Sequence, residues 1–216
     1  MSERAPSTQA LLACGVVAGP LYVVVTLVES LTRDGFDLRH DRFSWLTAGD
    51  LGWIHQVAMI GVGALSVLLA VGAGRRMREG RGAVWGPRLL ALFGAAYVAG
   101  GLLRADAVVG FPPGTTAEMV HQSWHGIAQN ASRSASSLFL VGASLVFASA
   151  FAAQGRRGWA CFYATALPAA FAALTGVGLA IGGNPVALAF LMTPWVWVTA
   201  LALNLYGRER VTASPA

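Results

Sequence analysis

Six long apolar stretches, separated by short polar segments, constrain this chain more than any other feature of its sequence. They cover residues 10–31, 51–74, 83–103, 125–153, 159–182 and 186–206. A helix needs about 20 mostly apolar residues to cross a bilayer. Only 12% of the 216 residues are charged, whereas a soluble domain carries about 25%. The sequence therefore predicts an all-α, polytopic integral membrane protein, in which six transmembrane helices form one bundle and one domain over residues 1–216.

The first apolar stretch is expected to remain in the protein as a helix. It is long, lacks the small residues of a signal-peptide cleavage site and ends at Glu29, so it does not resemble a removable signal peptide. Cys14 and Cys161 both fall at predicted cytoplasmic helix ends. Because that compartment is reducing, we expect no structural disulfide.

Arginine is distributed unequally between the two sides of the predicted bundle. The chain has a net charge of +5, and all its basic residues other than histidine are arginines. One side, which carries both termini and the 75–82 loop, holds Arg4, Arg75, Arg76, Arg78, Arg81, Arg156, Arg157, Arg208 and Arg210. The other side holds Arg33, Arg39, Arg42 and Arg104. Positive charge in short loops marks the cytoplasmic side. We therefore predict a multi-pass protein of the cell membrane whose two termini both lie in the cytoplasm. The arginines sit in loops between spans, which does not indicate nucleic-acid binding.

Most acids and all four histidines fall on the opposite, outer side. This group comprises Glu29, Asp34, Asp37, Asp41, Asp50, Asp106, Glu118, His40, His55, His121 and His125. Asp50 precedes the second apolar stretch and is a predicted N-cap. His121 and His125 have the i, i+4 spacing of two metal ligands on one helix, although such a pair often meets only water and head groups. We therefore expect no metal and no cofactor. If a metal were bound, His121 and His125 would be the candidate ligands.

The fourth helix is expected to begin before its apolar stretch. Thr115 and Glu118 fit a capping box, which predicts a helix over residues 116–153. Along it, His121, His125, Gln129 and Arg133 follow one another at intervals of four. An arginine inside a membrane needs a partner. We therefore predict that Arg133 is buried, pairs with Glu29 or Asp106, and shares a cavity with His125.

The polar segment HDRFSWLTAGDLGWIH, residues 40–55, joins the first two predicted helices. Its tryptophans, Trp45 and Trp53, are unexpected in a flexible linker, and an indole suits the membrane interface. We predict that this segment folds over the mouth of the bundle and contacts the 104–114 turn.

Three outer segments resemble signatures of a bacterial and archaeal membrane family catalogued as domain of unknown function nine-nine-eight. The first, within residues 37–63, matches at Asp41, Ser44, Leu46, Gly49, Gly52 and Trp53. The second matches at Asp106, Gly110, Phe111, Pro112, Pro113 and Gly114. The third matches at His125 and Gly126, with Gln129 where a second histidine is expected. The resemblance covers all six helices and implies a six-helix membrane protein, but no activity.

Three functions remain open for the outer polar residues. A lipid-binding, accessory or sensory membrane protein is the first expectation, with membrane lipid or a lipid-like small molecule as partner. A membrane-embedded hydrolase or cyclase acting on a lipid or isoprenoid-like substrate is the alternative, with Asp106, His125, His55 and Glu29 as catalytic candidates. A transporter is the third, although no internal repeat supports it. The predicted pocket comprises Glu29, Ser44, Asp50, His55, Arg104, Asp106, His121, His125, Gln129 and Arg133; the oligomeric state stays open.

Overall fold

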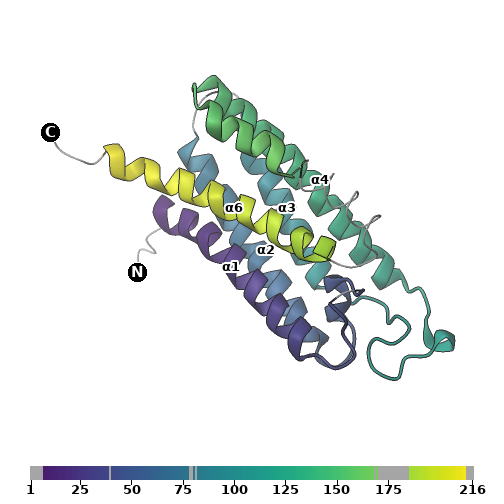
Figure 1. Ribbon diagram of the computed structural model, residues 1–216. Helices are drawn as coiled ribbons and strands as arrows, with labels where there is room; N and C mark the ends of the chain where they lie inside the picture. Colours follow the sequence, from purple (N-terminus) through teal and green to yellow (C-terminus); the bar gives the residue numbers. More distant parts are fainter. Residues whose placement is uncertain are drawn as a thin grey trace.

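The regular elements of the described residues are helices. The computed structural model describes residues 7–38, 40–77, 80, 82–167, 169 and 185–212, with side chains except at 185–191 and 208–212. The α-helices are α1 (Thr8–Thr32), α2 (Gly52–Arg76), α3 (Trp85–Gly101), α4 (Trp124–Ala153) and α6 (Pro185–Thr212), and residues 157–167 are also helical (Figure 1). Two 3-10 helices, η1 (Phe43–Thr47) and η2 (Ala117–Met119), lie in the connections. The predicted span over 159–182 lies largely outside the described residues.

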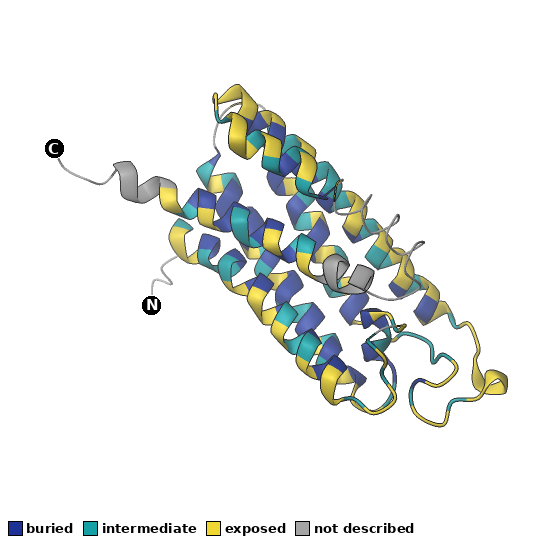
Figure 2. Ribbon diagram, in the orientation of Figure 1, coloured by how far each residue is buried: buried dark blue, intermediate teal, exposed yellow. Residues whose placement is uncertain are grey.

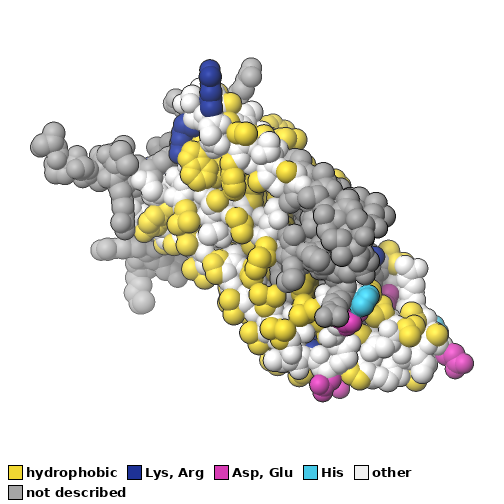
Figure 3. Space-filling view, viewed as in Figure 1, with side chains coloured by type: hydrophobic (Ala, Val, Ile, Leu, Met, Phe, Trp, Pro, Cys, Tyr) yellow, Lys and Arg dark blue, Asp and Glu magenta, His cyan; other side chains and the backbone are white. Residues whose placement is uncertain are grey.

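Within the part of the chain that the structure describes, three helices are long and apolar enough to cross a membrane, namely α1, α2 and α4. The buried faces of the helices point toward one another, and exposed residues line the outside (Figure 2). Many exposed residues are large and apolar, including Val24, Val57 and Leu138. On the face shown in Figure 3, hydrophobic side chains cover the middle, while charged ones gather at the two ends. An apolar surface of this extent indicates a protein that contacts lipid.

Helix α2 packs between α1 and α3, α3 also packs against α4, and α1 packs against α6. Glycine permits the closest of these approaches. A Cβ atom on Gly63 of α2 would lie 2.6 Å from the Gly94 carbonyl oxygen of α3, and one on Gly94 would lie equally close to the Gly63 carbonyl. Small residues at a helix crossing let the backbones approach in this way. Between the helices, Trp195 packs on Tyr22, Phe93 and Tyr97, with ring centroids 5.0 to 5.7 Å apart.

The predicted start of the fourth helix is wrong. Helix α4 begins at Trp124, and the Ser123 side chain caps it by accepting a hydrogen bond from the Gly126 N–H group. The Thr115 hydroxyl instead donates to the Pro112 carbonyl, and Glu118 lies in η2. The capping-box pattern was misleading because Gly110 and Gly114, both with positive φ, turn the chain before residue 115.

The predicted cap of the second helix is also wrong. Asp50 is exposed, and Leu51 occupies the N-cap position without a side-chain hydrogen bond. The reason is the tight turn that precedes α2. Gly49 has a φ of +74°, and a Cβ atom on Gly52 would collide with the Thr47 carbonyl. This turn carries the Asp50 side chain away from the first helical N–H groups.

Candidate functional site

The segment over residues 40–50 covers the end of the bundle, as predicted from its sequence. Arg33, which follows α1, donates hydrogen bonds of 2.7 Å to the carbonyls of Leu46 and Ala48. Burial lowers the pKa of the Arg33 guanidinium, and the nearby Glu29 carboxylate opposes that shift. The other side of the segment meets the 104–114 turn, because a Cβ atom on Gly49 would lie 2.8 Å from Pro112 Cγ.

Thr47 is the junction between this segment, the 104–114 turn and α4. Its buried hydroxyl accepts hydrogen bonds from the Ala105 N–H group at 2.9 Å and from Gln129 Nε2 at 2.7 Å. The same hydroxyl donates to the Ser44 carbonyl. Gln129 is 1% exposed, and its Oε1 atom has no hydrogen-bond partner among the described residues. The predicted site residue Gln129 therefore presents a free buried acceptor.

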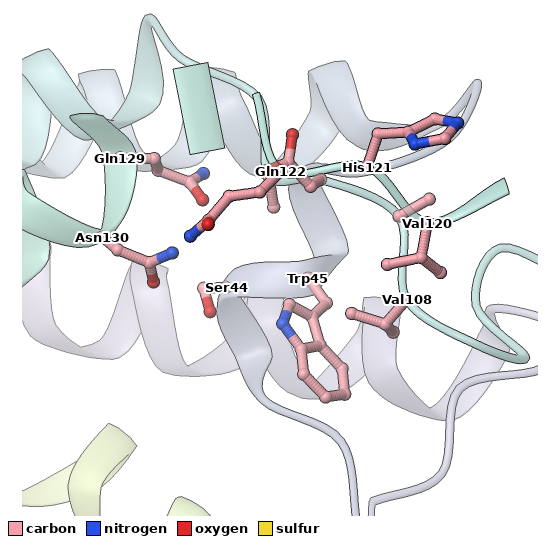
Figure 4. Close-up of a pocket in the computed structure, with 11 residues that line it drawn as sticks. Ser44, Trp45, Val108, Val120, His121, Gln122, Gln129 and Asn130 are labelled. Atoms are coloured by element: carbon pink, nitrogen blue, oxygen red, sulfur yellow. The ribbon is translucent and has the colours of Figure 1, made fainter. Parts of the chain in front are cut away.

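A pocket of about 210 Å³ opens beside this junction; we call it the outer pocket. Ser44, Trp45, Ala105, Asp106, Ala107, Val108, Val120, His121, Gln122, Gln129 and Asn130 line it. The amides of Gln122, Gln129 and Asn130 point toward the same space, with the Trp45 indole on its far side (Figure 4). The pocket wall is therefore rich in neutral hydrogen-bonding groups and has an aromatic face.

Asp106 belongs to this pocket but is held by the start of α4. Its carboxylate accepts hydrogen bonds from both the N–H group and the hydroxyl of Ser123. Only glycine fits at position 126, because a Cβ atom there would collide with the Asp106 carboxylate. Asp106 therefore fixes the helix start and pairs with neither Arg104, which is exposed, nor Arg133.

A second polar group lies between the helices and forms a line of three side chains; we call it the buried chain. His55 Nδ1 lies 2.7 Å from Glu29 Oε2, and His55 Nε2 lies 3.2 Å from the Tyr22 hydroxyl. If the imidazole is neutral and donates to Glu29 through Nδ1, its Nε2 atom accepts from the Tyr22 hydroxyl. Glu29 also lies 3.7 Å from the Arg33 guanidinium. This order of carboxylate, imidazole and hydroxyl can orient the histidine and move a proton along the line.

The predicted pairing of Arg133 with Glu29 or Asp106 is wrong. None of the ion pairs among the described residues includes Arg133. Its guanidinium instead interacts with the hydroxyls of Tyr22 and Tyr97. The physical reason is that both acids are already occupied, Glu29 by His55 and Arg33, and Asp106 by Ser123.

The two histidines of the predicted polar stripe do not share a helix face. His121 precedes α4, and its ring points away from the amides of the outer pocket (Figure 4). His125 is exposed and stacks on Trp124 at a centroid distance of 3.7 Å, so it shares no cavity with Arg133. The later start of α4 removes the i, i+4 relation. Within the described residues, no group of three His, Cys, Asp or Glu side chains could hold a metal ion.

The structure divides the predicted site residues among the buried chain, the outer pocket and the exposed surface, and Arg133 is half buried on α4. Glu29 and His55 belong to the buried chain, Ser44, Asp106, His121 and Gln129 line the outer pocket, and Asp50, Arg104 and His125 are exposed. Sequence reasoning missed Thr47, Tyr22 and Arg33 as site residues. A signal for two of them was available, since Tyr22, Thr26 and Glu29 share one face of α1 and Arg33 follows at the next interval of four, directly after the helix.

These features define a helical protein with helices long and apolar enough to cross a membrane, a polar line buried between the helices and a pocket at one end. The chain belongs to the family described as Protein of unknown function (DUF998), which matches residues 16–204. This confirms the resemblance found in its outer segments. Comparison with curated proteins and with solved structures gave no match.

Proposed function

We propose that this protein is a cell-membrane protein of six spans that binds the hydroxyl-bearing head group of a lipid or lipid-like molecule in the outer pocket. The observation that carries this proposal is the buried Gln129 Oε1 atom, which has no hydrogen-bond partner among the described residues and belongs to a side chain that lines the pocket. An unpaired buried acceptor costs about 1–3 kcal/mol. A ligand hydroxyl that donates to it would recover that energy.

The lining favours a neutral, hydroxylated group over a charged one. Gln122 and Asn130 offer amide donors and acceptors, and Trp45 offers a flat apolar wall against which a sugar ring or a glycerol backbone can pack. Asp106 repels an anion, while its hydrogen bonds to Ser123 leave it less able to attract a cation. A pocket at the end of an apolar bundle admits a head group while the acyl chain remains in lipid.

The binding test uses a monoacylglycerol with a fluorescent acyl chain and protein in nanodiscs. We expect Gln122→Leu, which keeps the side-chain size and removes the amide, to weaken binding about three- to tenfold, as expected for one hydrogen bond. Gln154→Leu is the matched control, because Gln154 is exposed beyond the far end of α4. The proposal would be contradicted if the two variants bound the monoacylglycerol equally well. It would also be contradicted if the wild-type protein bound the corresponding fatty-acid methyl ester, which lacks the glycerol hydroxyls, as well as it binds the monoacylglycerol.

We further propose that the outer pocket faces away from the cytoplasm and that both termini are cytoplasmic, on the basis of the arginine distribution. Cysteine labelling tests this in a Cys14→Ser/Cys161→Ser background. Thr116 and Arg157 are both exposed, and they precede and follow α4, which runs along the length of the bundle (Figure 1). On intact cells, an impermeant maleimide should label Thr116→Cys, and should label Arg157→Cys only after lysis. The opposite pattern would overturn the orientation.

The buried chain supports a second candidate, a membrane-embedded enzyme acting on a lipid or isoprenoid-like substrate. A carboxylate that orients an imidazole, which in turn contacts a hydroxyl, is an arrangement used in general-base catalysis. Glu29, His55 and Tyr22 provide it with distances of 2.7 and 3.2 Å. If the wild-type protein converts an added lipid into a chemically altered product and the His55→Gln variant does not, the result would favour an enzyme over a protein that only binds lipid.

A further inference from the structure

Arg156 lies in the turn that follows α4, at the far end of this helix from the outer pocket (Figure 1). Its side chain is half buried and held in place by three neighbours. Nη1 donates a hydrogen bond of 2.8 Å to Asn204 Oδ1 of α6. The guanidinium carbon also lies 5.1 Å from the ring centroid of Phe151 and 5.8 Å from that of Trp159. These contacts fix a cation at one position on the end of the bundle.

The neighbours of Arg156 leave its positive charge uncompensated. Asn204 is a neutral amide, and the two rings carry no charge. The acidic side chains that the structure describes all lie toward the end of the bundle at which α4 begins, and none of the ion pairs among the described residues includes Arg156. The hydrogen bond to Asn204 occupies one of the five N–H donors of the guanidinium. Arg156 can therefore bind an anion without leaving its present contacts.

The helix over residues 157–167 begins directly after Arg156 and adds donors at the same place. The first N–H groups of a helix have no intrahelical acceptors, and this end of a helix favours negative charge. A side chain that accepts a hydrogen bond usually caps such an end, but the arginine at position 156 has only donors. The exposed Arg157 adds a second positive charge. A Cβ atom on Gly158 would meet no atom within 4 Å, so the space beside this first turn is open.

The amide that holds Arg156 has an unused donor of its own. Asn204 is 8% exposed, and its Nδ2 atom has no hydrogen-bond partner among the described residues. Because Oδ1 of the same amide accepts from Arg156, this unused donor lies next to the guanidinium. Buried amide donors are normally satisfied. The place around Arg156 therefore has an excess of donors as well as an excess of positive charge.

We propose that Arg156, Arg157 and the first turn of the helix over residues 157–167 bind the phosphate group of an anionic membrane phospholipid, with Asn204 positioning Arg156. A guanidinium binds phosphate oxygens through paired hydrogen bonds, and helix N-termini bind phosphate through their N–H groups. Trp159, in the same turn, is 37% exposed, and an indole at the end of an apolar bundle suits the head-group region of a bilayer. The two arginines repel the ammonium of a zwitterionic head group, which favours an anionic lipid such as phosphatidylglycerol.

The test measures binding of dioleoyl-phosphatidylglycerol to the full chain in detergent, using native mass spectrometry. We expect Arg156→Gln to weaken binding about ten- to a hundredfold, because a charge-assisted hydrogen bond is lost. Arg88→Gln is the matched control, since Arg88 is an exposed arginine in the first turn of α3 that lies over Trp85. It should weaken binding less than about fivefold, the effect of one surface charge. Equal losses in the two variants would overturn the proposal.

Two substitutions of Asn204 test the site with both arginines in place, and they keep the proposal testable if Arg156→Gln does not fold. Asn204→Asp keeps the side-chain size and puts a carboxylate beside Arg156, so we expect binding to weaken about tenfold or more. Asn204→Leu removes the acceptor that holds the guanidinium and should weaken binding about threefold or more. Unchanged affinity in both variants would overturn the proposal, because Arg156 would then need no positioning.

Two ligand comparisons identify the group that is bound. Dioleoyl-phosphatidylcholine has the same acyl chains and should bind at least about fivefold more weakly; equal affinity would overturn the assignment to an anionic head group. Inorganic phosphate in large excess should not displace the lipid, and displacement would overturn the assignment to a lipid in favour of free phosphate. The outcome is separable from that of the outer-pocket test, because monoacylglycerol carries no phosphate.

Discussion

We expect Glu29→Leu to lower the free energy of unfolding by about 3–5 kcal/mol, the usual cost of removing one partner from a buried charged pair. Glu29 is buried and lies 2.7 Å from His55 Nδ1 and 3.7 Å from the Arg33 guanidinium. Leucine leaves the imidazole N–H group without an acceptor and the positive charge of Arg33 without its neighbouring carboxylate. The measurement is unfolding in detergent followed by circular dichroism.

The matched control is the same substitution at an exposed acid. Glu118 lies in η2 and is exposed, so Glu118→Leu should change stability by no more than about 0.5 kcal/mol. A double-mutant cycle with His55→Leu isolates the pair. We expect His55→Leu to cost much less in the Glu29→Leu background than in the wild type. Equal costs in both backgrounds would show that the two side chains do not interact energetically.

Thr47→Val should have the second-largest effect and lower the free energy of unfolding by about 2–4 kcal/mol, because buried groups left without a partner cost about 1–3 kcal/mol each. Valine has nearly the shape of threonine but cannot accept the hydrogen bonds from Ala105 N and Gln129 Nε2. The Ala105 N–H group then loses its partner. Gln129 keeps only its longer contact of 3.4 Å with the Leu103 carbonyl.

Thr47→Ser separates the hydroxyl from the methyl group. Serine retains the hydrogen bonds and removes one methyl group, so the free energy of unfolding of this variant should be lower by about 1 kcal/mol. Thermal unfolding of the two variants in the same detergent gives the comparison. If valine is tolerated as well as serine, then the hydroxyl does not join the 40–50 segment to α4, and the outer pocket has a different support.

The outer end of the bundle shows where local sequence patterns were insufficient. Thr115 and Glu118 match a capping box, yet α4 begins at Trp124 because Asp106 binds Ser123. That carboxylate lies 17 residues before the serine that it orders. A helix-start pattern includes only neighbouring residues, so it could not register this contact. The eight-residue error placed His121 on a helix that it does not enter and suggested a two-histidine face that does not exist.

Arg133 pairs with neither of the two acids that its sequence context predicts as partners. A cation in an apolar bundle does need compensation, but the nearest acids along the predicted topology were already engaged. Glu29 contacts His55 and Arg33, and these contacts depend on how α1 and α2 are rotated about their axes. Hydropathy does not determine that rotation when a helix is apolar on nearly all sides.

Hydropathy and charge along the sequence are sufficient to establish the class of the protein. Apolar stretches of about 20 residues and few charges define helices for a membrane, because a buried backbone in lipid must satisfy its own hydrogen bonds. The signatures near Ser44, Asp106 and His125 also identified the family, which matches residues 16–204. Which polar groups meet, in contrast, depends on how the helices pack in three dimensions. The partners of Glu29 and Thr47 lie up to 82 residues away along the chain, and only helix packing brings such groups within hydrogen-bonding distance.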